Sequence, residues 1–260
     1  MAEGDTVHRH ARRLARALGG VPLVSAEAPS PRSPLRLQRA ELASLAGRRL
    51  ERADAHGKHL FLRFERDLTL HCHHGMSGTW DLYAPDQRWR QRRSAAWLVL
   101  STPRMDAVEF GGTRLELRRD SELARDRRLR ALGPDPLADG FAPEDGVEAL
   151  RRRPHRERQL GDALLDQAVI AGIGNVYKAE GCFAARVSPW RRLADLSDTE
   201  LRRVVLETAS LMRAGLETGR RPRDVYGRAD RPCPRCGEAI AARGQGDADR
   251  TAYWCARCQQ

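Results

Sequence analysis

Hydrophobic residues recur with two different periods along the chain, and the change of period shows where its parts begin and end. Residues 5–18 carry apolar side chains at three- and four-residue spacing, which is typical of an amphipathic helix. Asp5 or Thr6 can cap this helix, and Gly19 and Gly20 can end it. The chain is therefore expected to begin with a helix.

Short strand-like runs separated by turn residues follow, from about residue 21 to residue 118. Clear examples are residues 59–64, 68–72, 96–100 and 113–117. Many short strands at regular spacing predict a β-sandwich. The highly charged stretch 119–130 and the Pro- and Gly-containing stretch 132–137 then interrupt the pattern, as a domain boundary does.

The second half of the chain shows helical periodicity and ends in a cysteine-containing module. Apolar residues recur every three or four positions near 144–152, 158–168, 176–185 and 197–218. We therefore expect an α+β protein in four parts: a β-sandwich domain with a leading helix at 1–120, a linker at 121–140, a helical domain at 141–228 and a small module at 229–260.

Charge narrows the choice of partner. The chain has 46 basic and 35 acidic residues, a formal net charge of +11 and a pI near 10.2. Such an excess attracts polyanions, among which nucleic acid is the commonest. No apolar run reaches the length of a membrane span, and the first residues lack the features of a signal peptide. We expect a cytoplasmic, nucleoid-associated protein that binds nucleic acid and no membrane.

Lysine is scarce, and its two positions are therefore informative. The chain holds 44 arginines but only Lys58 and Lys178. A lysine retained in this background suits a site that needs a compact ammonium able to lose its proton, although two lysines can also survive by chance.

Four cysteines predict a zinc site. Cys233 and Cys236 form one C-x2-C pair, and Cys255 and Cys258 form another after a gap of 18 residues. Two such turns can supply a closed tetrahedron of thiolates, which holds a segment too small to have its own core and performs no chemistry. Because a reducing cytoplasm disfavours disulfides, zinc is preferred to redox pairs.

Several motifs occur in the order of one known family. The chain resembles the Fpg/Nei family of DNA glycosylases (formamidopyrimidine-DNA glycosylase and endonuclease VIII), most of all its actinobacterial Nei-type members. The resemblance covers essentially the whole chain, and its motifs are Ala2-Glu-Gly-Asp5, His56-Gly-Lys58, His74-Gly-Met-Ser-Gly78, Asp166 to Lys178, and Arg250-Thr-Ala-Tyr-Trp-Cys255.

The resemblance implies a fold and a chemistry. It implies a helix-two-turn-helix domain at 141–228 and a β-hairpin zinc finger at 229–260. Once Met1 is removed, the amine of Ala2 would attack C1′ of a flipped nucleotide, with Glu3 as acid and Lys58 as electrostatic support.

The resemblance also implies contacts with double-stranded DNA by a monomer. Met76 and Phe110 would enter the base stack, and Asn175, Lys178 and Arg250 would lie at phosphates. On their own the residues allow plainer interpretations: an ordinary turn before Asn175, a packed methionine and a solvated arginine.

Three departures from the family pattern bear on activity and substrate. Ala2 stands where the family has proline, and Val108 stands where the Fpg enzymes have an arginine that contacts the orphaned base. The segment 215–226 leaves no room for the lesion-capping loop of the Fpg enzymes, which favours oxidised pyrimidines, abasic sites or crosslinks over oxidised guanine. Two functions stay open: a bifunctional glycosylase and lyase, or a damaged-DNA-binding protein of the same fold that Ala2 has weakened or inactivated.

Overall fold

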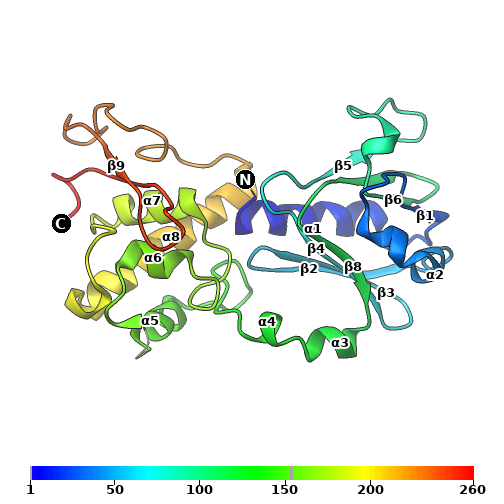
Figure 1. Ribbon diagram of the computed structural model, residues 1–260, viewed down its shortest axis with the longest axis horizontal. Helices are drawn as coiled ribbons and strands as arrows, with labels where there is room; N and C mark the ends of the chain where they lie inside the picture. Colours follow the sequence, from blue (N-terminus) through cyan, green and yellow to red (C-terminus); the bar gives the residue numbers. More distant parts are fainter. Residues whose placement is uncertain (1, 153–154) are drawn as a thin grey trace. The chain divides into compact units, whose positions relative to one another are not determined.

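The computed structural model describes residues 2–152 and 155–260, which form two compact units (Figure 1). Unit 1 contains Ala2 and residues 6–130, and unit 2 contains Glu3–Asp5 and residues 131–260. Met1, whose removal the resemblance implies, lies outside the described residues. The observed elements confirm the predicted α+β class.

Unit 1 is built on two four-stranded antiparallel sheets. One has the strand order β2-β3-β4-β8 and the other the order β1-β6-β7-β5. Their bounds are β1 Ser25–Glu27, β2 Leu50–His56, β3 His59–Phe64, β4 Leu68–His73, β5 Thr79–Tyr83, β6 Leu98–Ser101, β7 Asp106–Phe110 and β8 Arg114–Arg118.

A single apolar core joins the two sheets to α1 (Gly4–Leu18). Leu60 and Leu70 come from the first sheet, Trp80 and Leu100 come from the second, and the buried face of α1 includes Leu14. Side chains on a strand point alternately to its two faces, and β8 shows this plainly. Every second residue of β8 is buried, and the residues in between are partly exposed.

Four short elements of unit 1 escaped the sequence patterns. They are η1 (Pro34–Leu37), α2 (Arg39–Ala43), α3 (Asp120–Ala124) and α4 (Arg127–Arg130). Each is five residues or shorter, so none shows enough turns for a helical period to be recognised. A further short element, η2 (Arg93–Ala95), precedes β6.

Unit 2 is helical. Its helices are α5 (Pro143–Arg151), α6 (Leu160–Leu165), α7 (Asn175–Ala184), η4 (Leu193–Asp195) and α8 (Asp198–Thr218). The longest of them, α8, begins at a capping box in which the Ser197 hydroxyl accepts the Glu200 N–H at 3.2 Å. It ends at Gly219, whose φ of 72° suits a residue without a β-carbon.

The last part of unit 2 is a two-stranded hairpin made of β9 (Ala241–Arg243) and β10 (Ala252–Trp254). Buried Cys233, Cys255 and Ile240 pack there against Phe183 of α7. The apolar cluster that packs the hairpin against α7 is therefore very small, and the hairpin also depends on a link between its four cysteines.

A carboxyl lies unpaired in the core of unit 1. Glu109 on β7 is fully buried beside Cys72, and neither of its oxygens has a hydrogen-bond partner within 2–152 and 155–260. Burial raises the pKa of Glu109 well above its usual range. The folded protein therefore keeps a proton here over a range of pH in which the unfolded chain has released it.

Glu109→Gln should flatten the loss of stability that accompanies a rise in pH above the unfolded pKa of this carboxyl group. Because the folded pKa is the raised one, the stability that the protonated carboxyl provides is complete below the unfolded pKa of about 4.3 and is lost as pH rises toward the folded pKa. For one proton, the free energy of unfolding falls by at most about 1.4 kcal/mol per pH unit. Thermal unfolding between pH 5 and 9 measures it, with exposed Glu51→Gln as control. Parallel curves for Glu109→Gln and the unchanged protein would contradict the assignment.

Candidate active site

Glu3 is the most strongly held of the predicted catalytic residues. It is fully buried in unit 2, where its carboxyl group closes the N-terminus of α7. Its Oε1 accepts the Val176 N–H at 3.0 Å, and its Oε2 accepts the N–H groups of Gly174 at 3.1 Å and Tyr177 at 3.3 Å. Free N–H groups and the helix dipole make this place favourable for a negative charge.

The fit at this helix N-terminus depends on a glycine. A β-carbon at position 174 would lie 2.3 Å from Cδ of Glu3, so a side chain there would expel the carboxyl group. The Gly-Ile-Gly-Asn turn therefore does more than reverse the chain, because it admits Glu3 to the helix end. Sequence patterns gave no sign of this role, since the partners are more than 170 residues apart.

Asp5 was expected to cap α1, but α1 begins one residue earlier and Asp5 has another role. It is buried and forms an ion pair through both oxygens with Arg221, at 2.8 Å from Nε and 2.5 Å from Nη2. A bidentate pair of this kind fixes geometry as well as charge. Together with Glu3 it fastens the first residues of the chain to unit 2.

Asn175 lies in the first turn of α7, as expected, but its amide group is engaged. It is 9% exposed, and its Nδ2 donates to the Thr251 carbonyl at 2.9 Å, next to the predicted phosphate contact Arg250. Its Oδ1 is buried without a partner in the described part of the chain. Asn175 therefore connects α7 to the hairpin in this structure.

Lys178 is one turn further along α7 and is fully buried. Its Nζ has no hydrogen-bond partner among the residues that the structure describes. Burial lowers its pKa to about 8, against the opposing effect of nearby Cys182 and Asp162. Lys178 is thus placed inside unit 2 and not at its surface, where a direct phosphate contact would need it.

Lys58 occupies the two-residue turn between β2 and β3. His56 and His59 are paired across this turn, and Gly57 has a φ of 57°, which favours glycine at the first turn position. Lys58 is half-buried there. Burial and then the Lys58 charge lower the pKa of His73 on β4, which shows that the two side chains are close.

A chain of histidines supports the Lys58 turn, and the sequence patterns did not reveal it. His59 Nδ1 lies 2.9 Å from His71 Nε2, and His71 Nδ1 lies 3.0 Å from Glu116 Oε1. Burial and the neighbouring His71 lower the pKa of His59 to about 3, so it is neutral at physiological pH. The signal was available, because His71 and His73 share one face of β4 and His59 is the cross-strand partner of His73.

Met76 lies at the surface of unit 1. It is 62% exposed in the loop between β4 and β5. The loop is tight, because Gly78 N–H donates to the His74 carbonyl at 2.8 Å and a β-carbon on Gly78 would lie 2.6 Å from that oxygen. A short, constrained loop that presents one flexible apolar side chain suits insertion.

Phe110 does not have the placement that we expected. It is 4% exposed and packs with Val108 in a small cluster of unit 1, edge-on to Trp89 at 6.4 Å between ring centroids. Both faces of β7 are covered, so alternation along this strand does not bring Phe110 to the surface. A role as a wedge in the base stack would require the side chain to leave this packing when DNA binds.

Ala2 belongs to unit 1, where it is partly buried against the apolar core. Its backbone is joined directly to Glu3 of unit 2. The covalent link alone therefore brings the proposed nucleophile next to the carboxyl group that closes α7.

The four predicted metal ligands are gathered at one point. The four sulfur atoms all lie within 4.8 Å of one another; they belong to Cys233, Cys236, Cys255 and Cys258. The sulfur atoms of Cys236 and Cys255 are 3.5 Å apart. A tetrahedral zinc with Zn–S bonds of about 2.3 Å needs sulfurs roughly 3.8 Å apart. The donor set and its spacing therefore fit zinc. Arg250 is exposed in the loop that joins β9 and β10.

Comparisons with known proteins cover the whole chain. Residues 1–124 match the model of the formamidopyrimidine-DNA glycosylase N-terminal domain, and residues 132–225 match that of the formamidopyrimidine-DNA glycosylase H2TH domain. A Streptomyces coelicolor protein named probable endonuclease 8 2 is 40% identical over 100% of this chain and 94% of its own length. The DNA-(apurinic or apyrimidinic site) lyase Nei2 of Mycolicibacterium smegmatis is 33% identical over 100% and 99%.

A solved structure shows the same fold. The Lactococcus lactis Fpg in complex with DNA containing an abasic site superposes with a TM-score of 0.85 at 22% identity and covers 100% of both chains. Among the described residues, no helix is long and apolar enough to cross a membrane.

Proposed function

The chain belongs to the formamidopyrimidine-DNA glycosylase family, and from this premise we propose that it removes oxidised bases from double-stranded DNA and cleaves the abasic site that results. The observation that carries the proposal is the buried Glu3 carboxyl held at the N-terminus of α7. A carboxyl group buried beside the α-amine that removal of Met1 would leave on Ala2 is costly to keep without a use.

The reaction that we propose begins at the amine of Ala2. Its nitrogen forms a bond to C1′ of the flipped nucleotide while the bond from C1′ to the base breaks, and Glu3 supplies the proton that the departing base needs. The nitrogen then loses a proton, the bond from C1′ to the ring oxygen O4′ breaks as the C1′–N double bond forms, and O4′ takes up a proton, which leaves an imine with the opened sugar. Removal of a proton from C2′ then breaks the bond from C3′ to oxygen, and the phosphate leaves.

Other residues would orient the DNA. Lys58 would hold a phosphate or the opening sugar, Met76 would fill the space left by the flipped nucleotide, and Arg250 would contact a phosphate from the hairpin. Asn175 can join that contact if DNA displaces the Thr251 carbonyl. The buried Lys178 would act on the same phosphate through its charge alone.

Zinc would bind the four cysteines and fold the hairpin that presents Arg250. A closed four-thiolate site has no open position, so its contribution is structural. The short connection after α8 supports a proposal on substrate choice: Gly219 ends that helix, and only a few residues precede Tyr226. We propose that oxidised pyrimidines are preferred because no loop is present to cap an oxidised guanine.

A second function is favoured by one observation, the alanine at position 2. A primary amine on a flexible residue lacks the fixed direction of a proline nitrogen, so attack on C1′ can be too slow to matter. In that case the chain is a damaged-DNA-binding protein with the same fold and the same finger.

Borohydride trapping should capture this chain on a duplex that carries thymine glycol, because sodium borohydride reduces an imine to a stable bond. The chain offers only three amines, the α-amine and the two side chains of Lys58 and Lys178, so mass spectrometry of the adduct identifies the nucleophile. We expect the adduct on Ala2. An adduct on Lys178, whose pKa is lowered to about 8, would transfer the nucleophilic role to that residue.

The control is Ala2→Pro, which restores the ring that directs the attacking nitrogen. Trapping by both proteins, with the proline variant faster, supports the glycosylase. Trapping by the proline variant alone means that the natural chain is the DNA-binding form. Failure of both on thymine glycol, oxidised guanine and abasic duplexes would rule out the catalytic proposal.

A further inference from the structure

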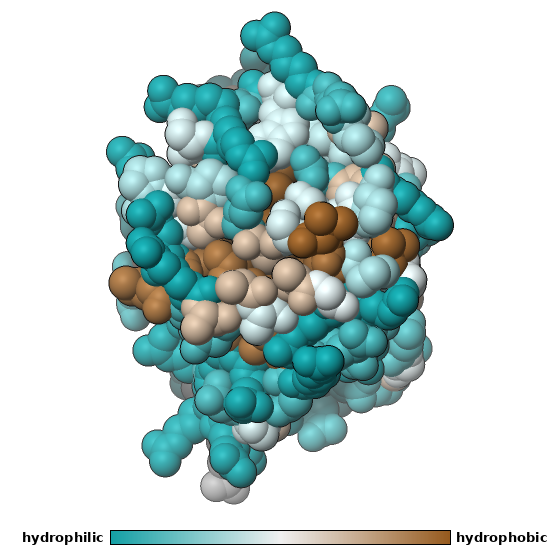
Figure 2. Space-filling view, turned by 90° about the vertical axis from the view of Figure 1, so that its right-hand side faces the viewer, coloured by the Kyte–Doolittle hydropathy of each residue, from teal (hydrophilic) through white to brown (hydrophobic). Residues whose placement is uncertain are grey.

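Exposed apolar side chains gather at one end of unit 1. Figure 2 shows this end as a patch of apolar surface ringed by hydrophilic side chains. Leu37 of η1 is 92% exposed, and Val24, just before β1, is 62% exposed. Contiguous apolar surface inside a polar rim is typical of a site where another macromolecule docks. We call the part of this region between β1 and α2 the β1/α2 surface and define it as Ala26, Ala28, Arg36, Arg39, Leu42 and Ala43.

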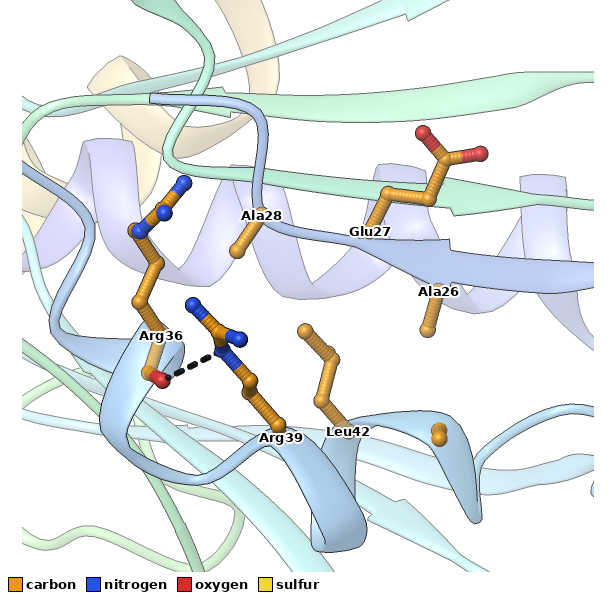
Figure 3. A pocket seen from close by; sticks show the side chains of 7 residues that line it. Ala26, Glu27, Ala28, Arg36, Arg39 and Leu42 are labelled. Atoms are coloured by element: carbon orange, nitrogen blue, oxygen red, sulfur yellow. Dashed lines mark hydrogen bonds between the residues drawn. The ribbon is translucent and has the colours of Figure 1, made fainter. Parts of the chain in front are cut away.

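The surface contains a preformed hollow. A cavity of about 270 Å³ lies between β1 and α2, with Ala26, Ala28 and Leu42 facing its interior (Figure 3). Glu27 points away from the cavity and pairs with Arg93 at 2.6 Å. Gln38, which joins η1 to α2, exchanges two hydrogen bonds with the backbone of Leu117 on β8, at 2.8 and 2.9 Å, so this side of the hollow is anchored to the sheet.

Two arginines without acidic partners border the hollow. Arg36 and Arg39 are exposed, and Nε of Arg39 donates only to the Arg36 carbonyl, at 3.2 Å (Figure 3). Within residues 2–152 and 155–260, neither guanidinium lies within ion-pair distance of a carboxylate. Arginine is enriched among the residues that dominate binding energy at protein interfaces, and an unpaired guanidinium fork fits a carboxylate.

The β1/α2 surface is remote from the Lys58 turn within unit 1. The β2 strand runs from Leu50 to His56, which spans about 20 Å, and the Lys58 turn follows its His56 end. The segment that leads into β1 lies at the other end of β2, where isolated β-bridges pair Gly19 with Leu50 and Pro22 with Arg49. A partner on this surface would therefore not cover the Lys58 turn.

We propose that the β1/α2 surface binds an acidic peptide segment of another protein, with one apolar side chain in the hollow and carboxylates on Arg36 and Arg39. Duplex DNA would satisfy the arginines through its phosphates but would leave the aliphatic lining of the hollow without an apolar partner. A second copy of this chain is disfavoured by its net charge of +11.

The test is a selection from a library of random 12-residue peptides displayed on phage, with the full protein immobilised. We expect the enriched peptides to combine Asp or Glu with Leu, Ile or Phe, and a synthetic copy to bind at least about tenfold more weakly to the Arg36→Glu/Arg39→Glu variant. Ala43→Trp, which fills the hollow, should weaken binding similarly. The matched control is Arg203→Glu/Arg213→Glu, which reverses two exposed arginines on α8 and should leave binding unchanged.

Four results would overturn the proposal. The first is the absence of an enriched acidic and apolar pattern. The second is equal binding to the variants and the unchanged protein, and the third is displacement of the peptide by an undamaged duplex, which would assign the surface to DNA. The last concerns a second copy of the chain and is tested by sedimentation of the protein alone, which measures its oligomeric state. A dimer that Ala43→Trp dissociates would assign the surface to a second copy. Binding is measured without catalysis, so failure of the glycosylase proposal does not affect the outcome.

Discussion

Cys255→Ser should release the metal and abolish binding to duplex DNA. The hairpin has strands of only three residues each and an apolar cluster of a few side chains, which together cannot hold its fold. Structural zinc sites supply roughly 10–16 kcal/mol to such modules, so removal of one thiolate should unfold the hairpin and take Arg250 with it. Because Asn175 donates to Thr251 of the same loop, the N-terminal end of α7 would also lose a partner.

Zinc content per chain and fluorescence anisotropy with a damaged duplex measure the two effects together. We expect almost no zinc and at least about a hundredfold weaker binding, since contacts to phosphates dominate affinity. Cys182→Ser is the matched control, because Cys182 is another buried cysteine of unit 2 that is not part of the cluster. A Cys255→Ser protein that lacks zinc but binds the duplex normally would show that the hairpin does not contribute to DNA binding.

The periodic parts of the chain could be predicted, and the reasons are local. Strand β3 was expected at 59–64 and is found there, because its alternation and flanking turn residues lie within a few positions. The helix expected at 158–168 ends earlier, at Leu165, because the Asp166 side chain accepts the Ala168 N–H at 2.9 Å and forms a turn instead.

Residue identities in the candidate site could be proposed from motifs, but their environments could not. Glu3 is held by N–H groups more than 170 positions away, and the Asn175 amide points to Thr251 because of the way the hairpin folds back. The burial of Phe110 could not be predicted from its motif either. Its strand is covered on both faces, so a residue that the motif places near DNA lies in the interior.

Glu3→Gln should nearly eliminate base removal. A positioned acid contributes about 10²- to 10⁴-fold to a rate, and the proton for the departing base is needed whichever amine attacks C1′. Cleavage at a preformed abasic site should suffer less, because no base has to leave. The measurement is therefore the ratio of the two rates on thymine glycol and abasic duplexes of the same sequence.

The substitution also disturbs the helix end, and the control must account for this. Both oxygens of Glu3 accept N–H groups of α7, so the amide of glutamine would turn a donor toward a donor and leave a buried N–H unsatisfied, at a cost of about 1–3 kcal/mol. Glu180 provides a close match. It is also buried in unit 2 and also accepts three backbone N–H groups, those of Asp224, Val225 and Tyr226.

Glu180→Gln should therefore reproduce the loss of stability without changing the ratio of the two rates. If each substitution lowers the rates of base removal and of abasic-site cleavage by the same factor, Glu3 only caps the N-terminus of α7. If only Glu3→Gln changes the ratio, the carboxyl group acts on the departing base. The helix N-terminus then has a second use, because the N–H groups that fix the position of Glu3 also stabilise the carboxylate that forms when the proton leaves.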